Sequence, residues 1–156
     1  MSEATTAAAI LRNTYDGPAW YGPSVSQILE DVTNVQAQER PIAGCHTIWE
    51  LVLHMNAWQE FSLDVIEDRR SGDSGGVVDW PEVRDTSPEA WHAAVAALKV
   101  SANRLRDAIA GLSGDRLREK VPQREFPIKV LAHGITDHTI YHAGQIVLLK
   151  KALAAG

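Results

Sequence analysis

Two histidines one helical turn apart are the residues of this chain best suited to metal chemistry. His138 and His142 stand four positions apart, so on an α-helix they share one face, with Cβ atoms roughly 5–6 Å apart. Imidazoles placed in this way can reach one ion, at about 2.0–2.1 Å each for zinc. A third histidine, His54, lies in another helical segment. Three histidine ligands would leave one coordination position open, as catalytic metal sites do and structural ones do not.

A simpler interpretation of the same histidines stays open. His54, His138 and His142 each occupy the apolar stripe of a helical segment, so each is expected to point into the core. A buried imidazole needs hydrogen-bond partners, and core histidines bonded to carbonyl groups or water would show the same spacing. Considered together, the three favour a metal site, because such sites in helical bundles are built from inward side chains on facing helices.

Four other residues are candidates for a pocket around this site. His46 precedes the expected start of a helix and could project toward the mouth of the site, or simply pack against that helix start. Gln145 could donate to a ligand of the metal or be a polar residue at the stripe edge. Trp58 and Tyr141 could line a pocket, although aromatic residues at helical spacing usually belong to a core.

The elements that would position these residues are helices, since no segment shows the alternation of a strand. Thr47 and Glu50 match a capping box, and Ser87 followed by Pro88 marks another helix start. A glycine-rich loop is long enough to cross the end of a bundle. The sequence predicts an all-α, four-helix bundle. Its first helical region is interrupted by Gly17-Pro18 and consists of residues 4–15 and 24–38. The second helix is expected over 47–70, followed by the loop 71–85, and the third and fourth over 87–111 and 128–154.

Composition narrows the class of protein. The chain has 156 residues, enough for one domain with a real core, and a net charge of −5 that argues against nucleic acid as the main partner. Cys45 is the only cysteine, so no intramolecular disulfide can form, which fits a reducing cytoplasm. No stretch approaches the roughly 18 apolar residues of a membrane helix, and the N-terminus does not resemble a secretory signal. We therefore expect a cytoplasmic protein without a membrane partner.

Two segments, 49–58 and 138–146, carry a resemblance to a known family. Trp49 to Trp58, with His54 inside it, and His138 to Ile146 resemble the DinB-like superfamily, also called DinB/YfiT-like metalloenzymes. The resemblance covers nearly the whole chain in length and helix order, so it implies that 1–156 is a single DinB-like domain. It also implies an up-down-down-up helix order with a long crossing loop after helix two. Its three-histidine metal site falls on His54, His138 and His142, and a homodimer is implied as well.

The resemblance and the histidines together predict a divalent-metal-binding protein acting on a small-molecule substrate. Three neutral imidazoles suit zinc, nickel, copper or iron, of which zinc and nickel are the first expectations. The expected enzyme is a thiol-dependent S-transferase using a low-molecular-weight thiol, or a hydrolase-like enzyme that activates water. No general base is evident beside the ligands. The alternative is a non-catalytic metal-binding or stress-response helical dimer whose metal stabilises the fold.

Overall fold

A computed structural model describes residues 1–155 of the protein, which form seven α-helices and no β-strand within that range. Four helices are long and three have five residues each. The predicted all-α class is confirmed, and the structure adds three short helices to the four helices that the sequence predicted. The helices are α1 (Glu3–Asp16), α2 (Val25–Leu29), α3 (Asn34–Gln38), α4 (Ile48–Ile66), α5 (Pro88–Ala110), α6 (Gly114–Arg118) and α7 (Ile128–Ala155).

The starts of the long helices follow the capping motifs of the sequence. The Thr47 side chain accepts a hydrogen bond from the backbone N–H of Glu50, and the Glu50 carboxylate accepts one from the N–H of Thr47. This reciprocal box fixes the first turn of α4. At α5 the Ser87 side chain caps the N–H of Ala90, with Pro88 in the first turn. Both predicted starts are confirmed.

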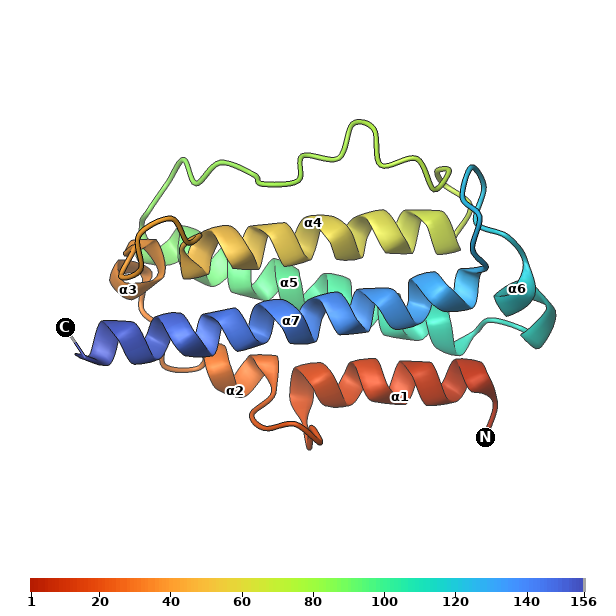
Figure 1. The fold of residues 1–156 in the computed structure, drawn as a ribbon, viewed down its shortest axis with the longest axis horizontal. Coiled ribbons are helices and arrows are strands. Elements are labelled where there is room, and N and C mark those ends of the chain that lie inside the picture. Colours follow the sequence, from red (N-terminus) through yellow and green to blue (C-terminus); the bar gives the residue numbers. More distant parts are fainter. Residues whose placement is uncertain (156) are drawn as a thin grey trace.

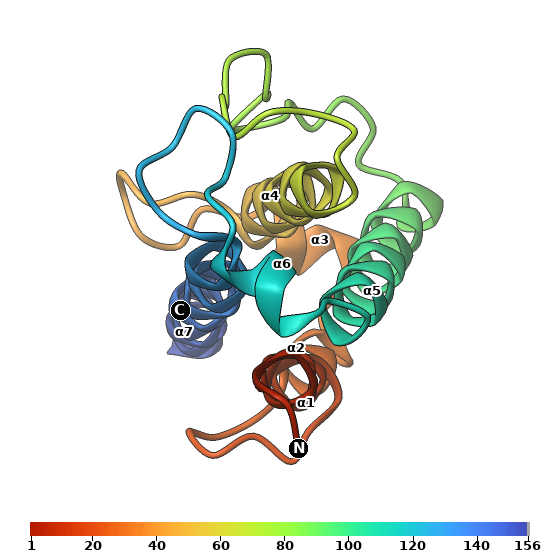
Figure 2. The ribbon, with the colours of Figure 1, turned by 90° about the vertical axis from the view of Figure 1, so that its right-hand side faces the viewer.

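The four long helices lie lengthwise beside one another. Seen end-on in Figure 2, they surround a common core in the order α4, α5, α1, α7, and α6 lies across the near end. Each helix in this ring packs against its two neighbours. Colours in Figure 1 show that α4 and α5 run in the same direction and that α1 and α7 run opposite to them. The facing helices α4 and α7 carry the three candidate histidines.

Three predicted boundaries differ from the structure for local reasons. The expected helix over 24–38 is split into α2 and α3, because Thr33 forms a second capping box with Gln36 and so starts a new helix. Helix α4 ends at Ile66 rather than near Arg70, since Asp68 adopts a left-handed conformation with φ of 57°. Helix α6 lies between the helices predicted over 87–111 and 128–154, where no element was predicted, because its five residues are too few to show periodicity.

A long loop, residues 67–87, returns the chain along the outside of α4 to the start of α5 (Figure 1). Its Gly72 donates its N–H to the carbonyl of Pro122 at 2.8 Å, in the connection between α6 and α7. A Cβ at Gly72 would lie 2.4 Å from Cγ1 of Val121. Only glycine therefore permits this close approach of the two loops. We refer to residues 67–87 as the crossing loop.

The core is apolar and is anchored by two tryptophans. Trp49 and Trp91 are each 2% exposed, and their ring centroids lie 5.2 Å apart. The indole N–H of Trp91 donates to the backbone carbonyl of Val32 at 2.8 Å, which ties α5 to the segment between α2 and α3. Over residues 1–155, none of the helices has the combination of length and apolar character that spanning a membrane requires.

Candidate metal centre

The three candidate histidines meet between α4 and α7. Nε2 of His54 lies 2.9 Å from Nε2 of His138, which in turn lies 3.1 Å from Nε2 of His142. The nitrogens of all three lie within 4.8 Å of one another. Nitrogens bound tetrahedrally to one zinc ion at about 2.0–2.1 Å would be separated by roughly 3.3 Å. The cluster therefore has the dimensions of a three-ligand site.

Hydrogen bonds on the side that faces away from the cluster fix the tautomers of His54 and His142. Nδ1–H of His54 donates to the backbone carbonyl of Asp79 at 2.7 Å, and Nδ1–H of His142 donates to Oε1 of Gln145 at 2.7 Å. A neutral imidazole carries only one proton. Nε2 of both rings is thus a bare acceptor directed at the cluster, which is the tautomer and orientation that a metal ligand requires.

His138 lies between these two acceptors and cannot satisfy both. Its Nδ1 is buried and has no hydrogen-bond partner among the described residues. With a proton on Nε2, His138 can donate well to only one neighbour; with the proton on Nδ1, that proton is unpaired and three lone pairs face one another. A cation would satisfy all three Nε2 atoms at once. The donor set therefore fits a divalent ion better than it fits a hydrogen-bonded core.

Aromatic rings enclose the cluster on the side of the crossing loop. Trp80 lies between His46 and His54, with centroid separations of 3.4 and 3.9 Å and interplanar angles of 6° and 9°. Next to it, the indole N–H of Trp58 donates to Oδ1 of Asp79 at 2.7 Å. The same carboxylate oxygen lies 3.2 Å from Nδ1 of His54. The crossing loop therefore both orients and covers His54.

The electrostatics of the cluster favour neutral imidazoles. Burial lowers the pKa of His138 to about 4, and the proximity of His142 and His54 acts in the same direction. Burial also lowers the pKa of His142, partly opposed by its hydrogen bond to Gln145. Since the neutral form of histidine is the one that binds metal, protons compete weakly for these two ligands at neutral pH.

The sequence around the three histidines matches a known protein family. The sequence model described as the DinB superfamily matches residues 23–146, a range that contains all three histidines. The chain belongs to the DinB superfamily. Comparison of this DinB superfamily chain with curated proteins and with solved structures found no match.

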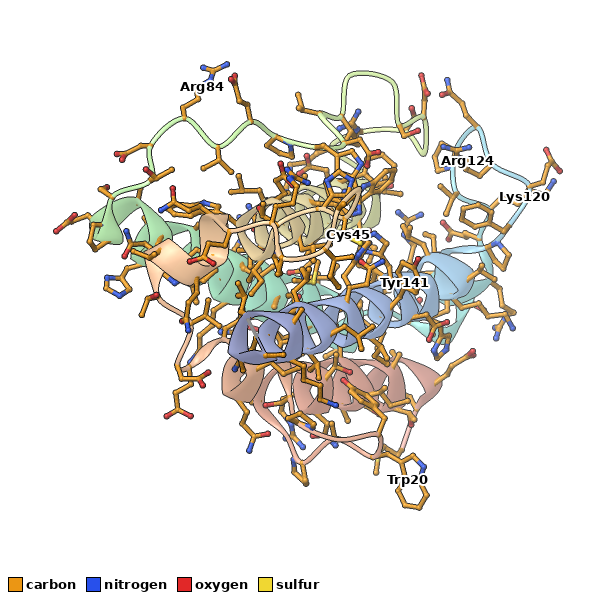
Figure 3. The ribbon with its side chains drawn as sticks, turned by 60° about the vertical axis from the view of Figure 1, so that its left-hand side comes forward. Trp20, Cys45, Arg84, Lys120, Arg124 and Tyr141 are labelled. Carbon is orange, nitrogen blue, oxygen red and sulfur yellow. The ribbon has the colours of Figure 1, made fainter. Side chains whose placement is uncertain are left out.

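The four other residues predicted around the site of this DinB superfamily protein differ in how closely they approach the histidine cluster. Gln145 contacts His142 itself, as its hydrogen-bond acceptor. Trp58 lies beside the cluster, with its ring centroid 6.2 Å from that of His138. His46 lies at the edge, stacked on Trp80. Tyr141 is 65% exposed on the outer face of α7, although its ring centroid is 5.0 Å from that of His142 (Figure 3).

Sequence reasoning missed Asp79 and Trp80, which interact with His54 more closely than any of the four predicted neighbours. Both lie in the crossing loop, about 25 positions after His54. The only signal in the sequence was Trp80, the one aromatic residue in the segment 71–85. A residue that contacts His54 mainly through its backbone carbonyl leaves no trace in its side-chain type.

We expect the metal-free protein to lose stability as the pH falls from about 6.5 to about 4. The folded state holds His138 neutral with a pKa of about 4, whereas the unfolded chain protonates it near 6.5. Between these two pKa values the unfolded state binds more protons than the folded state. The free energy of unfolding therefore keeps its full value above pH 6.5 and decreases as the pH falls toward 4. The loss should amount to about 2 kcal/mol in urea unfolding at pH 5 against pH 7.5. A His138→Asn variant, which does not titrate, should show a shallower dependence; an equal slope in both would contradict the assignment.

Proposed function

We propose that this DinB superfamily protein is a divalent-metal-dependent enzyme whose metal is held by Nε2 of His54, His138 and His142. The observation that carries the proposal is the convergence of three Nε2 atoms, two of which are fixed as acceptors by the outer bonds to Asp79 and Gln145. Zinc and nickel suit this ligand set. When bound, such an ion acts as a Lewis acid and activates a nucleophile at neutral pH.

The proposed reaction is transfer of a low-molecular-weight thiol to a small electrophile, or hydrolysis of a small substrate. Both need a nucleophile that loses its proton, so both need a group to accept it. A three-ligand set leaves room for the nucleophile or the substrate. The stacked rings of Trp80, His54 and His46 restrict water on the side of the crossing loop, which strengthens electrostatic interactions inside the site.

His46 is the side chain best placed to move that proton. Its Nδ1 bonds to Oε2 of Glu50 at 3.2 Å, and 45% of the side chain is exposed, so Nε2 is the nitrogen left for exchange with a substrate or solvent. Although burial raises the pKa of Glu50, bonds from the N–H of Thr47 and from Arg40 lower it overall. Glu50 therefore stays ionised and holds His46, in addition to capping α4.

The proposal also covers the helix order, the oligomeric state and the compartment of the protein. We propose that the four long helices form a single-domain bundle in up-down-down-up order, for which the directions in Figure 1 are the support. We also propose a cytoplasmic homodimer. The exposed apolar side chains of Tyr141 and Leu148 on α7 offer a face for a second copy, and the free thiol of Cys45 fits a reducing compartment.

Elemental analysis of untagged protein tests the metal site directly. The wild type should carry about one divalent ion per chain, and His54→Ala should lose it, because two histidines cannot hold the ion as three do. His133→Ala is the matched control, since His133 lies on α7 but is exposed, and it should keep the metal. Full metal content in His54→Ala would remove that residue from the site. Metal without activity toward thiol acceptors or esters would favour the non-catalytic alternative.

A further inference from the structure

A cavity lies directly beside the histidine cluster. It has a volume of about 380 Å³, within the range of small-molecule sites. Its walls come from α4, α7 and the connection between α6 and α7. They are mainly apolar and include Trp58, Phe61, Val121, Phe126, Leu131 and Ile135.

The cavity and the cluster share two residues. His138 and Trp58 line the cavity; His138 carries one of the three Nε2 atoms, and the ring centroid of Trp58 lies 6.2 Å from that of His138. A molecule in the cavity would therefore contact the ring of a proposed metal ligand. This adjacency is what makes the cavity a candidate substrate site rather than a packing defect.

An arginine that lines the cavity, and a second one over a wall residue, have no carboxylate partner among residues 1–155. Seven of the ten arginines of the chain form ion pairs with aspartate or glutamate, and among the described residues three do not: Arg12, Arg70 and Arg124. Arg124 lines the cavity. The guanidinium of Arg70 lies 4.9 Å from the ring centroid of Phe61, a wall residue. One of the three unpaired arginines thus lines the cavity, and a second lies over the ring of one of its wall residues.

The position of Arg124 is fixed by the crossing loop. Its Nε donates to the carbonyl of Gly72 at 2.7 Å and its Nη2 to Oγ of Ser74 at 3.3 Å. Figure 3 shows Arg124 on the connection before α7, beside the crossing loop. These bonds use two of the three nitrogens and leave the donors of Nη1 for a ligand. The arginine is therefore held in place before a ligand arrives, which limits the entropy lost on binding.

We propose that this cavity binds a small molecule with an apolar body and a carboxylate group. The apolar walls would bury the body, and Arg124 would pair with the carboxylate. The role of this molecule as substrate rests on the proposed function. The binding site itself does not, because Arg124 and the walls other than His138 and Trp58 make no contact with the outer hydrogen bonds that orient the proposed metal ligands.

Isothermal titration calorimetry with octanoate and octanamide tests the proposal on the full chain. Octanoate should bind with one site per chain, both as purified and after chelation, and more tightly than the neutral amide. Arg124→Gln should weaken octanoate about tenfold or more and leave octanamide within about twofold. Equal binding of the two probes in the wild type, or no binding of octanoate, would overturn the proposal. Binding of octanoate only before chelation would assign its carboxylate to the metal and overturn the role of Arg124.

Two glycines of α7 provide a matched pair of variants that locate the site. Gly134 lines the cavity, whereas Gly144 does not, and a Cβ at either position meets no atom within 4 Å. Both lie inside a helix, so leucine should favour the helix at each. Gly134→Leu should fill the cavity and weaken octanoate at least tenfold, whereas Gly144→Leu should bind as the wild type does. Full binding by Gly134→Leu would place the ligand elsewhere. Parallel metal analysis separates this failure from failure of the metal site.

Discussion

His138→Leu should abolish the stabilisation of this protein by divalent metal while stabilising the metal-free form. The imidazole of His138 is the one member of the cluster with a buried nitrogen that has no partner, and an unsatisfied buried polar atom costs about 1–3 kcal/mol. Leucine fills a similar volume without that atom. The variant also loses the proposed ligand atom, Nε2 of His138, that lies between Nε2 of His54 and Nε2 of His142.

The measurement is thermal unfolding with and without zinc or nickel. At a thousandfold excess over the dissociation constant, the wild type should gain about 4 kcal/mol, and His138→Leu should gain almost nothing. After chelation, the variant should melt about 2–4 °C above the wild type for each kcal/mol recovered. A variant that still responds fully to the metal would exclude His138 as a ligand. A chelated variant that melts well below the wild type would show that His138 is a satisfied core residue.

Trp91→Ala should destabilise the protein by about 3–5 kcal/mol, a large part of the stability of a typical domain. Trp91 is 2% exposed and packs against Trp49, so alanine leaves a cavity in the centre of the core. The substitution also removes the donor to the carbonyl of Val32. Both losses act on the packing of α5 against the rest of the core, and not on the histidines.

Urea unfolding of Trp91→Ala beside Trp20→Ala measures this effect against a control of the same residue type. Trp20 is 102% exposed and projects away from the helices in Figure 3. Its removal should change the unfolding free energy by less than about 0.5 kcal/mol. A loss of similar size in both variants would mean that Trp20 is covered in solution, for example by a second copy of the chain.

The long helices could be predicted from the sequence because their signals are local. Thr47 with Glu50 and Ser87 with Pro88 fix the starts of α4 and α5 through bonds that span three or four residues. The cluster was predictable for a related reason: a helix places His138 and His142 on one face whatever surrounds it. The short helices were not predicted. Helix α6 has too few residues for a periodic pattern, and the capping box that starts α3 at Thr33 lies inside the segment 24–38 that was expected to form one helix.

The surroundings of the site depend on contacts between distant segments, which no local pattern encodes. The bond from His54 to the carbonyl of Asp79 joins residues 25 positions apart, and Arg124 meets Gly72 across 52 positions. Gln145 was identified as a site residue, yet its role as acceptor for His142 became clear only from the geometry. Chemical type and helical spacing indicated the histidines and Gln145, whereas Asp79 and Trp80 came to light only from the three-dimensional packing.

The crossing loop is longer than its route requires. It runs back along α4, whose 19 residues span roughly 28 Å, while its own residues, about 21 in number, would reach roughly 70 Å if fully extended. More than half of its contour length is therefore slack. Asp79 and Trp80 are held at His54 by their contacts and not by chain tension, so the parts of the loop outside these contacts and those of Gly72 and Ser74 are free to gain or lose residues in evolution. Variation in loop length could reshape the entrance to the site while the bundle and its three histidines stay unchanged.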